Sequence, residues 1–270
     1  MNKIDQTFKK LRNEFRAALI PFIVAGDPDL TATEALLLKM AEAGADMIEL
    51  GVPFSEPVAD GPTIRAAHRR ALQNGVGLKE ILSMTGRLMD RIPPLILMTY
   101  FKPVSEYGRK DFAKDCKGNG IEGVIIPDLS PEEAGKWIDE ARKMDLDTIF
   151  LVAPDSSPVR IRWAVRSSRG FIYYASVTGI TGTRERLPEG LETSIGRIKE
   201  QTKKPVVVGF GISNSEQVKE VSRFADGVIV GSAIVKIIEK NINTSSLVER
   251  AGHFVSSLTE VLMVTWPDKT

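Results

Sequence analysis

The segment Met47-Ile48-Glu49-Leu50-Gly51-Val52-Pro53-Phe54-Ser55-Glu56-Pro57-Val58-Ala59-Asp60-Gly61-Pro62 joins a short apolar run to a loop that ends in an aspartate. The apolar run has the length of a buried strand and carries one carboxylate, Glu49. Burying a carboxylate costs free energy unless the group is paired or protonated, so chemistry explains this placement better than stability does. Two carboxylates in different surroundings, Glu49 and Asp60, are what an enzyme needs to divide acid and base roles.

Seven further apolar runs of similar length are spread along the chain, separated by longer helical patterns. Most of them lack polar alternation, which is typical of parallel strands covered on both faces. The eight expected strands are 19–25, 47–51, 95–99, 123–127, 148–152, 171–175, 205–209 and 227–230. Eight strands, each followed by a helix, predict an α/β fold of the (β/α)8 TIM-barrel type.

Capping residues locate several of the expected helices. The first follows Thr31 and ends at Gly44, and another follows Ser130, with Glu133 completing a capping box. The expected ranges are 32–43, 131–144 and 213–224, together with two helices inside 62–91 that are separated near 74–77. An amphipathic helix within 1–16, with Ile4, Phe8, Leu11 and Phe15 on its apolar face, precedes the barrel, and a last helix within 245–264 packs outside it.

The chain length of 270 residues suits one TIM barrel, which takes about 250 residues. No linker or low-complexity tract divides the chain, so residues 1–270 are expected to form a single domain. The main rival is an open doubly wound sheet, whose first strand usually leads into Gly-x-Gly-x-x-Gly. Here the first strand leads into Gly26-Asp27-Pro28-Asp29, which favours the barrel.

Composition excludes several classes of function. A net charge of +1 argues against a nucleic-acid partner, and no apolar run approaches the roughly 20 residues that span a membrane. One cysteine, Cys116, allows no internal disulfide and is expected of a cytoplasmic chain. With two histidines far apart, His68 and His253, a metal site built from Cys and His is not expected.

Three glycine-rich stretches follow the last three expected strands, at 178–183, 209–213 and 231–233. Each glycine alone can simply ease a tight turn. Together, with the Ser232 hydroxyl at a helix N-terminus, they favour a phosphate site built from backbone amides.

Both carboxylates have a purely structural alternative. Glu49 can pair with a lysine or arginine at the barrel rim, but its apolar neighbours favour a functional group whose pKa burial raises. Asp60 can equally be a helix cap, because Asp-Gly-Pro often precedes a helix.

Aromatic residues at strand ends, Phe22, Tyr100, Tyr173 and Phe210, are expected to line a flat apolar pocket. The Tyr173 hydroxyl is placed to hydrogen-bond to Glu49 across the barrel. The polar loop 183–190 is either solvated or a lid over the mouth.

At this point the chain resembles a known family. The segments 21–28, 49–55 with 59–64, 179–182 and 209–212 are similar to those of the tryptophan synthase alpha chain, from the first strand to the last helix. The resemblance implies a carbon–carbon lyase that cleaves indole-3-glycerol phosphate to indole and glyceraldehyde 3-phosphate by a retro-aldol reaction. It implies that Glu49 moves protons and that Asp60 holds the indole N–H.

The resemblance also implies the substrate contacts. The indole ring would lie among Phe22, Ile64, Tyr100 and Phe210, with Tyr173 nearby. The phosphate would rest on amides of Gly182, Gly211, Gly231 and Ser232, beside Thr181. No metal or organic cofactor is implied for this subunit.

The implied partner is a beta subunit, which carries pyridoxal phosphate, in an αββα heterotetramer with an internal tunnel for indole. The loop 53–60 and the lid would communicate with that partner. The chain has Glu56 where the family usually has aspartate, which keeps the charge but moves it by one methylene.

Three alternatives stay open at this stage. One is a free-standing lyase of the same chemistry that needs no partner, and another is a non-catalytic phosphate-binding barrel with a regulatory role. The third is an isomerase or aldolase acting on another sugar phosphate. A Schiff-base aldolase needs a lysine in the barrel mouth, and Lys102 is the one lysine just past a strand that is not strictly excluded.

Overall fold

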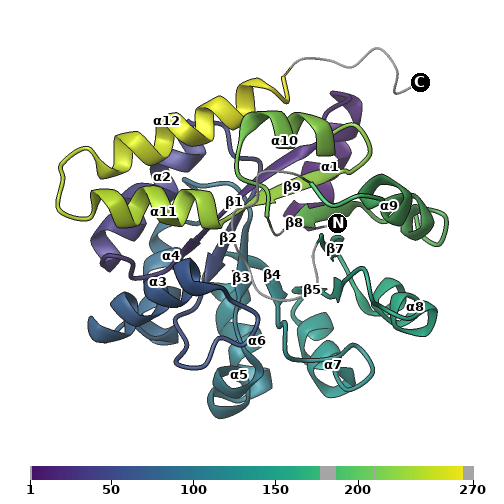
Figure 1. Ribbon diagram of the computed structural model, residues 1–270. Coiled ribbons are helices and arrows are strands. Elements are labelled where there is room, and N and C mark those ends of the chain that lie inside the picture. Colours follow the sequence, from purple (N-terminus) through teal and green to yellow (C-terminus); the bar gives the residue numbers. More distant parts are fainter. Residues whose placement is uncertain (1, 177–186, 210, 264–270) are drawn as a thin grey trace.

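A computed structural model describes residues 2–176, 187–209 and 211–263 (Figure 1). These residues contain nine strands, and all of the strand pairs are parallel. The strands are β1 Ala18–Val24, β2 Ile48–Gly51, β3 Leu95–Met98, β4 Ile121–Ile125, β5 Asp147–Ile149, β6 Leu151–Val152, β7 Ile172–Ala175, β8 Val206–Gly209 and β9 Gly227–Val230.

The strand order β5-β4-β3-β2-β1-β9-β8-β7-β6 closes on itself, because one residue, Phe150, separates β5 from β6. The expected fifth strand, 148–152, is therefore split in two. Its break has a local cause: the Phe150 N–H donates to the Ser168 hydroxyl at 3.1 Å instead of to a strand. The predicted TIM barrel is confirmed, with this one strand divided between its two neighbours.

Twelve helices in the described residues surround the barrel (Figure 1). They are α1 Lys3–Asn13, α2 Leu30–Glu42, α3 Pro62–Gln73, α4 Leu78–Leu88, α5 Phe101–Tyr107, α6 Arg109–Gly118, α7 Gly135–Lys143, α8 Pro158–Ser167, α9 Leu191–Lys199, α10 Ser215–Val221, α11 Ser232–Asn241 and α12 Leu247–Glu260. Within the described ranges, no helix is long and apolar enough to cross a membrane.

Two expected helix starts are wrong. The cap of α2 is Asp29, whose side chain accepts from the Ala32 N–H, and not Thr31. The Glu133 N–H does donate to the Ser130 hydroxyl at 3.3 Å, as expected of a cap, but the Glu133 carboxylate accepts from the Ser130 hydroxyl at 2.6 Å and not from its backbone N–H. The segment forms a separate turn, and α7 begins only at Gly135. The predicted break between the helices now labelled α3 and α4 is confirmed.

Side chains on the strands alternate between two cores. In β1, Ala18, Ile20 and Phe22 face the barrel interior, whereas Leu19 and Ile23 face the surrounding helices. Glu49 occupies an interior position of β2, since its register partner on β1 is the interior residue Phe22. The alternation therefore aims this carboxyl group into the barrel.

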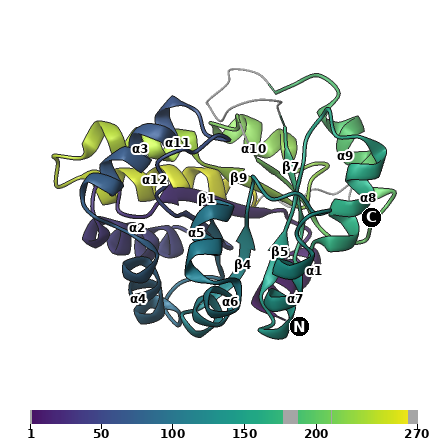
Figure 2. The same cartoon turned by 90° about the horizontal axis from the view of Figure 1, so that it is seen from below.

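Helix α1 closes the amino-terminal end of the barrel, at the lower end of the strands in Figure 2. Its residues Ile4, Phe8 and Leu11 are buried in the interior core, and Phe8 packs edge-on against Phe171. Phe15, expected on the same apolar face, is 53% exposed, because α1 ends at Asn13 and the chain turns there with a positive φ.

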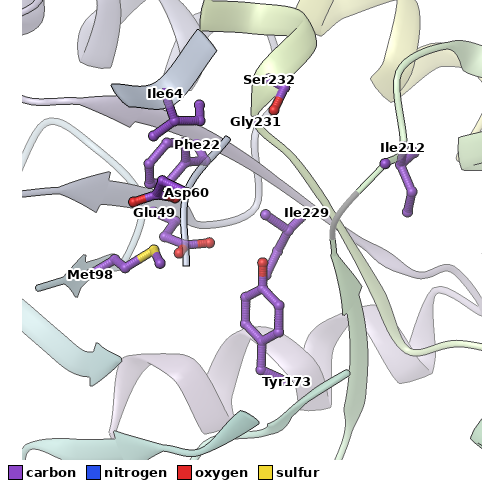
Figure 3. A pocket seen from close by; sticks show the side chains of 11 residues that line it. Phe22, Glu49, Asp60, Ile64, Met98, Tyr173, Ile212, Ile229, Gly231 and Ser232 are labelled. Carbon is purple, nitrogen blue, oxygen red and sulfur yellow. The ribbon is translucent and has the colours of Figure 1, made fainter. Parts of the chain in front are cut away.

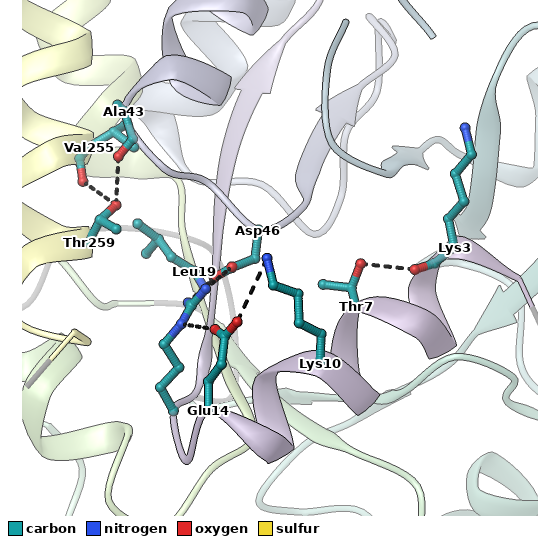
Figure 4. Close-up of polar contacts among 10 residues, drawn as sticks. Lys3, Thr7, Lys10, Glu14, Leu19, Ala43, Asp46, Val255 and Thr259 are labelled. Atoms are coloured by element: carbon teal, nitrogen blue, oxygen red, sulfur yellow. Dashed lines mark hydrogen bonds and ion pairs between the residues drawn. The ribbon is translucent and has the colours of Figure 1, made fainter. Parts of the chain in front are cut away.

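Polar contacts tie the chain together around this end (Figure 4). Arg16 donates to both oxygens of Asp46 at 2.8 Å, and Asp46 also accepts from the Leu19 N–H. Farther along the chain, the Thr259 hydroxyl of α12 donates to the Ala43 carbonyl after α2 at 2.9 Å. The last helix packs on the outside of the barrel, as expected. With the lower end closed by α1, the carboxyl ends of the strands form the accessible mouth.

Candidate active site

A pocket of about 410 Å³ opens among the carboxyl ends of the strands (Figure 3). The lining residues are Phe22, Glu49, Asp60, Ile64, Met98, Tyr173, Gly211, Ile212, Ile229, Gly231 and Ser232. The two carboxylates that the sequence singled out therefore share one cavity, although 11 positions separate them along the chain.

Glu49 is buried without a hydrogen-bond donor from the described residues. Its exposed fraction is 1%, and neither carboxyl oxygen accepts a hydrogen bond from a described residue. Burial, and secondarily the charge of Asp60, raises the pKa of Glu49 from 4.5 to about 8. The alternative of a rim ion pair finds no support in the described residues, and the expected hydrogen bond from Tyr173 is wrong. Glu49 thus holds a proton at neutral pH.

Asp60 is equally buried but well connected. Its Oδ2 accepts from the Tyr100 hydroxyl at 2.9 Å and lies 3.2 Å from His68 Nε2. The residue at the cap position of α3 is Gly61, and no side chain caps that helix. The helix-cap interpretation of Asp60 is therefore wrong, and its carboxylate is held by two side-chain donors.

The ring of Tyr100 does not line the pocket, contrary to the expectation. It stacks on Phe54 with ring centroids 4.9 Å apart, and its hydroxyl lies between Asp60 and the Ala59 N–H. Burial, with the nearby Asp60, raises the pKa of Tyr100. This tyrosine therefore holds Asp60 by a hydrogen bond without lining the pocket itself.

His68 was not predicted as part of the site. It lies on α3 one turn after Ile64, so that both side chains are buried on the same helix face. Its Nδ1 accepts from the Phe54 N–H at 3.3 Å, while Nε2 faces Asp60. The helical spacing signals burial for this residue, but its partners depend on the fold.

The apolar wall combines predicted and unpredicted residues. Phe22, Ile64 and Tyr173 line the pocket as expected, and Met98, Ile212 and Ile229 were not predicted. Gly209 is required beside Tyr173, because a Cβ there would overlap the tyrosine hydroxyl. The result is a cavity that is apolar except at its carboxylates and its glycine-rich end.

The glycine-rich end lies at the start of α11. Gly231 precedes this helix, no side chain caps it, and Ser232 is its first residue. Gly211, with φ +86°, brings backbone close to the same pocket. Uncapped amides at a helix N-terminus form a ready anion site.

Some expected residues are not covered by these observations. Thr181, Gly182 and Phe210 lie outside the described residues, as does the first half of the expected lid, residues 183–186 of 183–190. No lysine lines the pocket as described, and Lys102 is exposed on α5. The described ranges contain no group of three or more His, Cys, Asp or Glu side chains that could hold a metal ion.

With this geometry established, comparison with known proteins identifies the family. A sequence profile of the tryptophan synthase alpha chain matches residues 8–262. The tryptophan synthase alpha chain of Geobacter sulfurreducens is 47% identical over 97% of this chain and 99% of its own length. That of a Thermoanaerobacter species is 43% identical over 97% and 100%.

The chain belongs to the tryptophan synthase alpha chain family. Solved structures agree with the sequence comparison. Mycobacterium tuberculosis tryptophan synthase superposes with a TM-score of 0.90 at 37% identity, covering 97% of this chain and 99% of that one. Tryptophan synthase subunit alpha of Legionella pneumophila gives 0.89 at 36%, covering 97% and 98%. The resemblance seen in the sequence is confirmed, and with it the alpha-chain lyase activity on indole-3-glycerol phosphate in tryptophan biosynthesis.

Proposed function

We propose that Glu49 and Asp60 carry the retro-aldol cleavage in this alpha chain. Protonated Glu49 gives its proton to the indole carbon that bears the glycerol phosphate chain, and Asp60 holds the ring N–H as positive charge develops. Glu49 then takes the proton of the hydroxyl on the adjacent carbon. The carbon–carbon bond breaks, its electrons return to the ring, and indole and glyceraldehyde 3-phosphate leave.

The observation that carries this assignment is the buried carboxyl group of Glu49, which accepts no hydrogen bond from a described residue and whose pKa is raised to about 8. A group that first gives and then takes a proton works best when its pKa lies near the working pH. Glu49 takes back as many protons as it gives, so the cycle needs no second acid.

The remaining site residues fit the same substrate. Phe22, Ile64 and Tyr173 offer an apolar surface to the indole ring, and Gly211, Gly231 and Ser232 offer amides to the phosphate. The other members of the proposed substrate set are Thr181, Gly182 and Phe210. Tyr100 acts behind Asp60 in this proposal rather than against the ring. No step assigned to these residues calls on a metal or organic cofactor.

The proposed setting is a cytoplasmic αββα complex, in which this chain forms one domain and passes indole to a beta subunit. A groove of the described surface supports a docking role for the loop 53–60. It is lined by loop residues including Glu56 and the 65% exposed Val58, and by Arg65 and Arg69 of α3. The loop also carries Asp60, so a partner bound at the groove would contact the same loop that holds the proposed catalytic carboxylate.

The first test is indole release from indole-3-glycerol phosphate by the purified chain, alone and with a beta subunit, beside Glu49→Gln. Weak activity alone, a rise with the partner, and a loss of at least about 100-fold in the variant are expected, as for removal of a general acid–base group. A fully active variant would overturn the assignment of Glu49. High activity without a partner response would favour the free-standing lyase.

A further inference from the structure

The loop between β2 and α3 is tied down at two backbone positions. Near its start, the Phe54 N–H donates to His68 Nδ1 at 3.3 Å. Near its end, the Ala59 N–H donates to the Tyr100 hydroxyl oxygen, also at 3.3 Å. Both anchoring side chains then meet at the same atom, Asp60 Oδ2.

The contacts of His68 define its tautomer. A ring nitrogen that accepts a hydrogen bond carries no proton, so the Phe54 N–H leaves the proton on Nε2. Nε2 is therefore a donor, and it lies 3.2 Å from Asp60 Oδ2. The side-chain exposure is 4% for His68 and 3% for Asp60, so water does not compete for this contact.

The two donors leave the carboxylate with a defined orientation. Among the described residues, Oδ2 takes both hydrogen bonds and Oδ1 takes none. Asp60 lines the pocket, and Oδ1 is accordingly the oxygen available to a ligand N–H. The histidine stands on a twelve-residue helix rather than on the loop, so it provides a rigid reference for a loop-borne group.

We propose that His68 is a positioning residue for the lyase reaction: in its Nε2–H form it orients Asp60 so that Oδ1 meets the indole N–H. The role rests on the proposed function of Asp60. His68 does not touch the substrate. It fixes both the carboxylate and, through Phe54, the beginning of the loop that carries it.

Two substitutions separate this role from simple packing. His68→Gln keeps a donor near the position of Nε2, whereas His68→Phe keeps a ring of similar volume and removes both polar contacts. His68→Phe should lower kcat about 10- to 100-fold with a smaller change in KM, because a misplaced group of this kind costs mainly transition-state binding. His68→Gln should stay within about fivefold of the unsubstituted chain, well short of the loss expected for a misplaced group.

The control is the other histidine, His253, which is exposed on α12. His253→Gln should leave kcat unchanged. Equal activity in His68→Phe and the unsubstituted chain would overturn the positioning role, as would equal losses in the Phe and Gln variants. An unsubstituted chain that releases no indole with or without a beta subunit would overturn the proposed function itself, and the positioning role with it.

A second measurement needs no activity and no folded Phe variant. The chain contains two histidines, so histidine-selective ¹⁵N labelling gives two imidazole patterns, and His253→Gln assigns them. Long-range ¹H–¹⁵N correlation should show the His68 proton on Nε2, with a signal that moves in Asp60→Asn. A proton on Nδ1, or a signal indifferent to Asp60→Asn, would overturn the inference even in an active enzyme.

Discussion

Glu49 illustrates at the scale of one residue how a barrel makes a reactive carboxyl group. Strand alternation directs it into the interior core, where no described residue donates to it, and the charge of Asp60 further disfavours ionisation. Asp60 lies in the same pocket but receives two side-chain donors. The two carboxyl groups therefore differ because their neighbours differ, as the proposed division between proton transfer and charge stabilisation requires.

The raised pKa of Glu49 predicts the pH dependence of catalysis. The first step needs the protonated acid, and that form is lost as the pH rises through about 8. We therefore expect kcat/KM for indole release to be level near neutral pH and to fall tenfold per unit well above pH 8. A stopped assay across pH 6 to 10 measures this, and a profile that rises across that range would contradict the assigned role.

The same shift predicts a pH-dependent cost in stability. Because the folded-state pKa is above the unfolded value, the unfolded chain ionises first, and stability falls as the pH rises from about 4.5 to about 8. Glu49→Gln has no charge to bury, so its advantage in free energy of unfolding over the unsubstituted chain should grow across that window. The growth is at most about 5 kcal/mol. Urea titrations at pH 5 and pH 9 measure it, and a constant difference would contradict the buried charge.

Sequence reasoning found some site residues and missed others for physical reasons. Glu49 was visible because its apolar neighbours are adjacent in the chain. His68 and the supporting role of Tyr100 were not, since their contacts with Asp60 join three segments that only the fold brings together. Helical periodicity marks His68 as buried, but burial alone does not reveal which group it faces.

At the scale of elements, α1 closes the amino-terminal end of the barrel. Its apolar side chains complete the interior core below the strands, so its contribution is tertiary packing more than helix propensity. Helix α7 shows how little local hydrogen bonds alone decide. In the segment before it, Ser130 and Glu133 form two hydrogen bonds, yet the regular helix starts only at Gly135, because a local hydrogen-bond pair stabilises a turn without fixing the conformation of the next residues.

The packing of α1 against the interior core predicts that truncating one of its side chains will greatly lower the free energy of unfolding. Phe8→Ala removes a ring that is 6% exposed and packs edge-on against Phe171, so we expect a loss of about 3 to 5 kcal/mol in free energy of unfolding. Lys9→Ala, at the next and exposed position, is the matched control and should change stability by less than about 0.5 kcal/mol. Chemical denaturation of both variants measures the difference. Similar values would mean that α1 does not close the core.

At the scale of the whole molecule, the alternation of strands and helices was enough to predict a barrel. The manner of closure was not predictable, because it depends on one residue, Phe150, turning its N–H toward Ser168 instead of along the sheet. That detail involves a contact across 18 positions and has no signature in the strand itself.

The two ends of the barrel differ in what they carry. With α1 at the amino-terminal end, the pocket and the loop 53–60 share the opposite face, and the groove beside Val58 is formed partly by the loop that carries Asp60. A partner bound at that groove can change the loop without entering the pocket. Partner response should consequently depend on the surface of the loop and not on exposed apolar residues elsewhere around the ring.

Two exposed valines test this dependence. Val58 is 65% exposed on the loop, and Val159 is 53% exposed on α8, on the other side of the ring from α3 in Figure 1. A beta subunit should raise indole release by the unsubstituted chain on the order of tenfold or more. Val58→Asp should remove most of that rise by replacing an apolar side chain at the proposed contact with a charged one, while Val159→Asp should keep it. Titration of each variant with the beta subunit, followed by indole release, decides the matter, because equal responses would place the partner elsewhere.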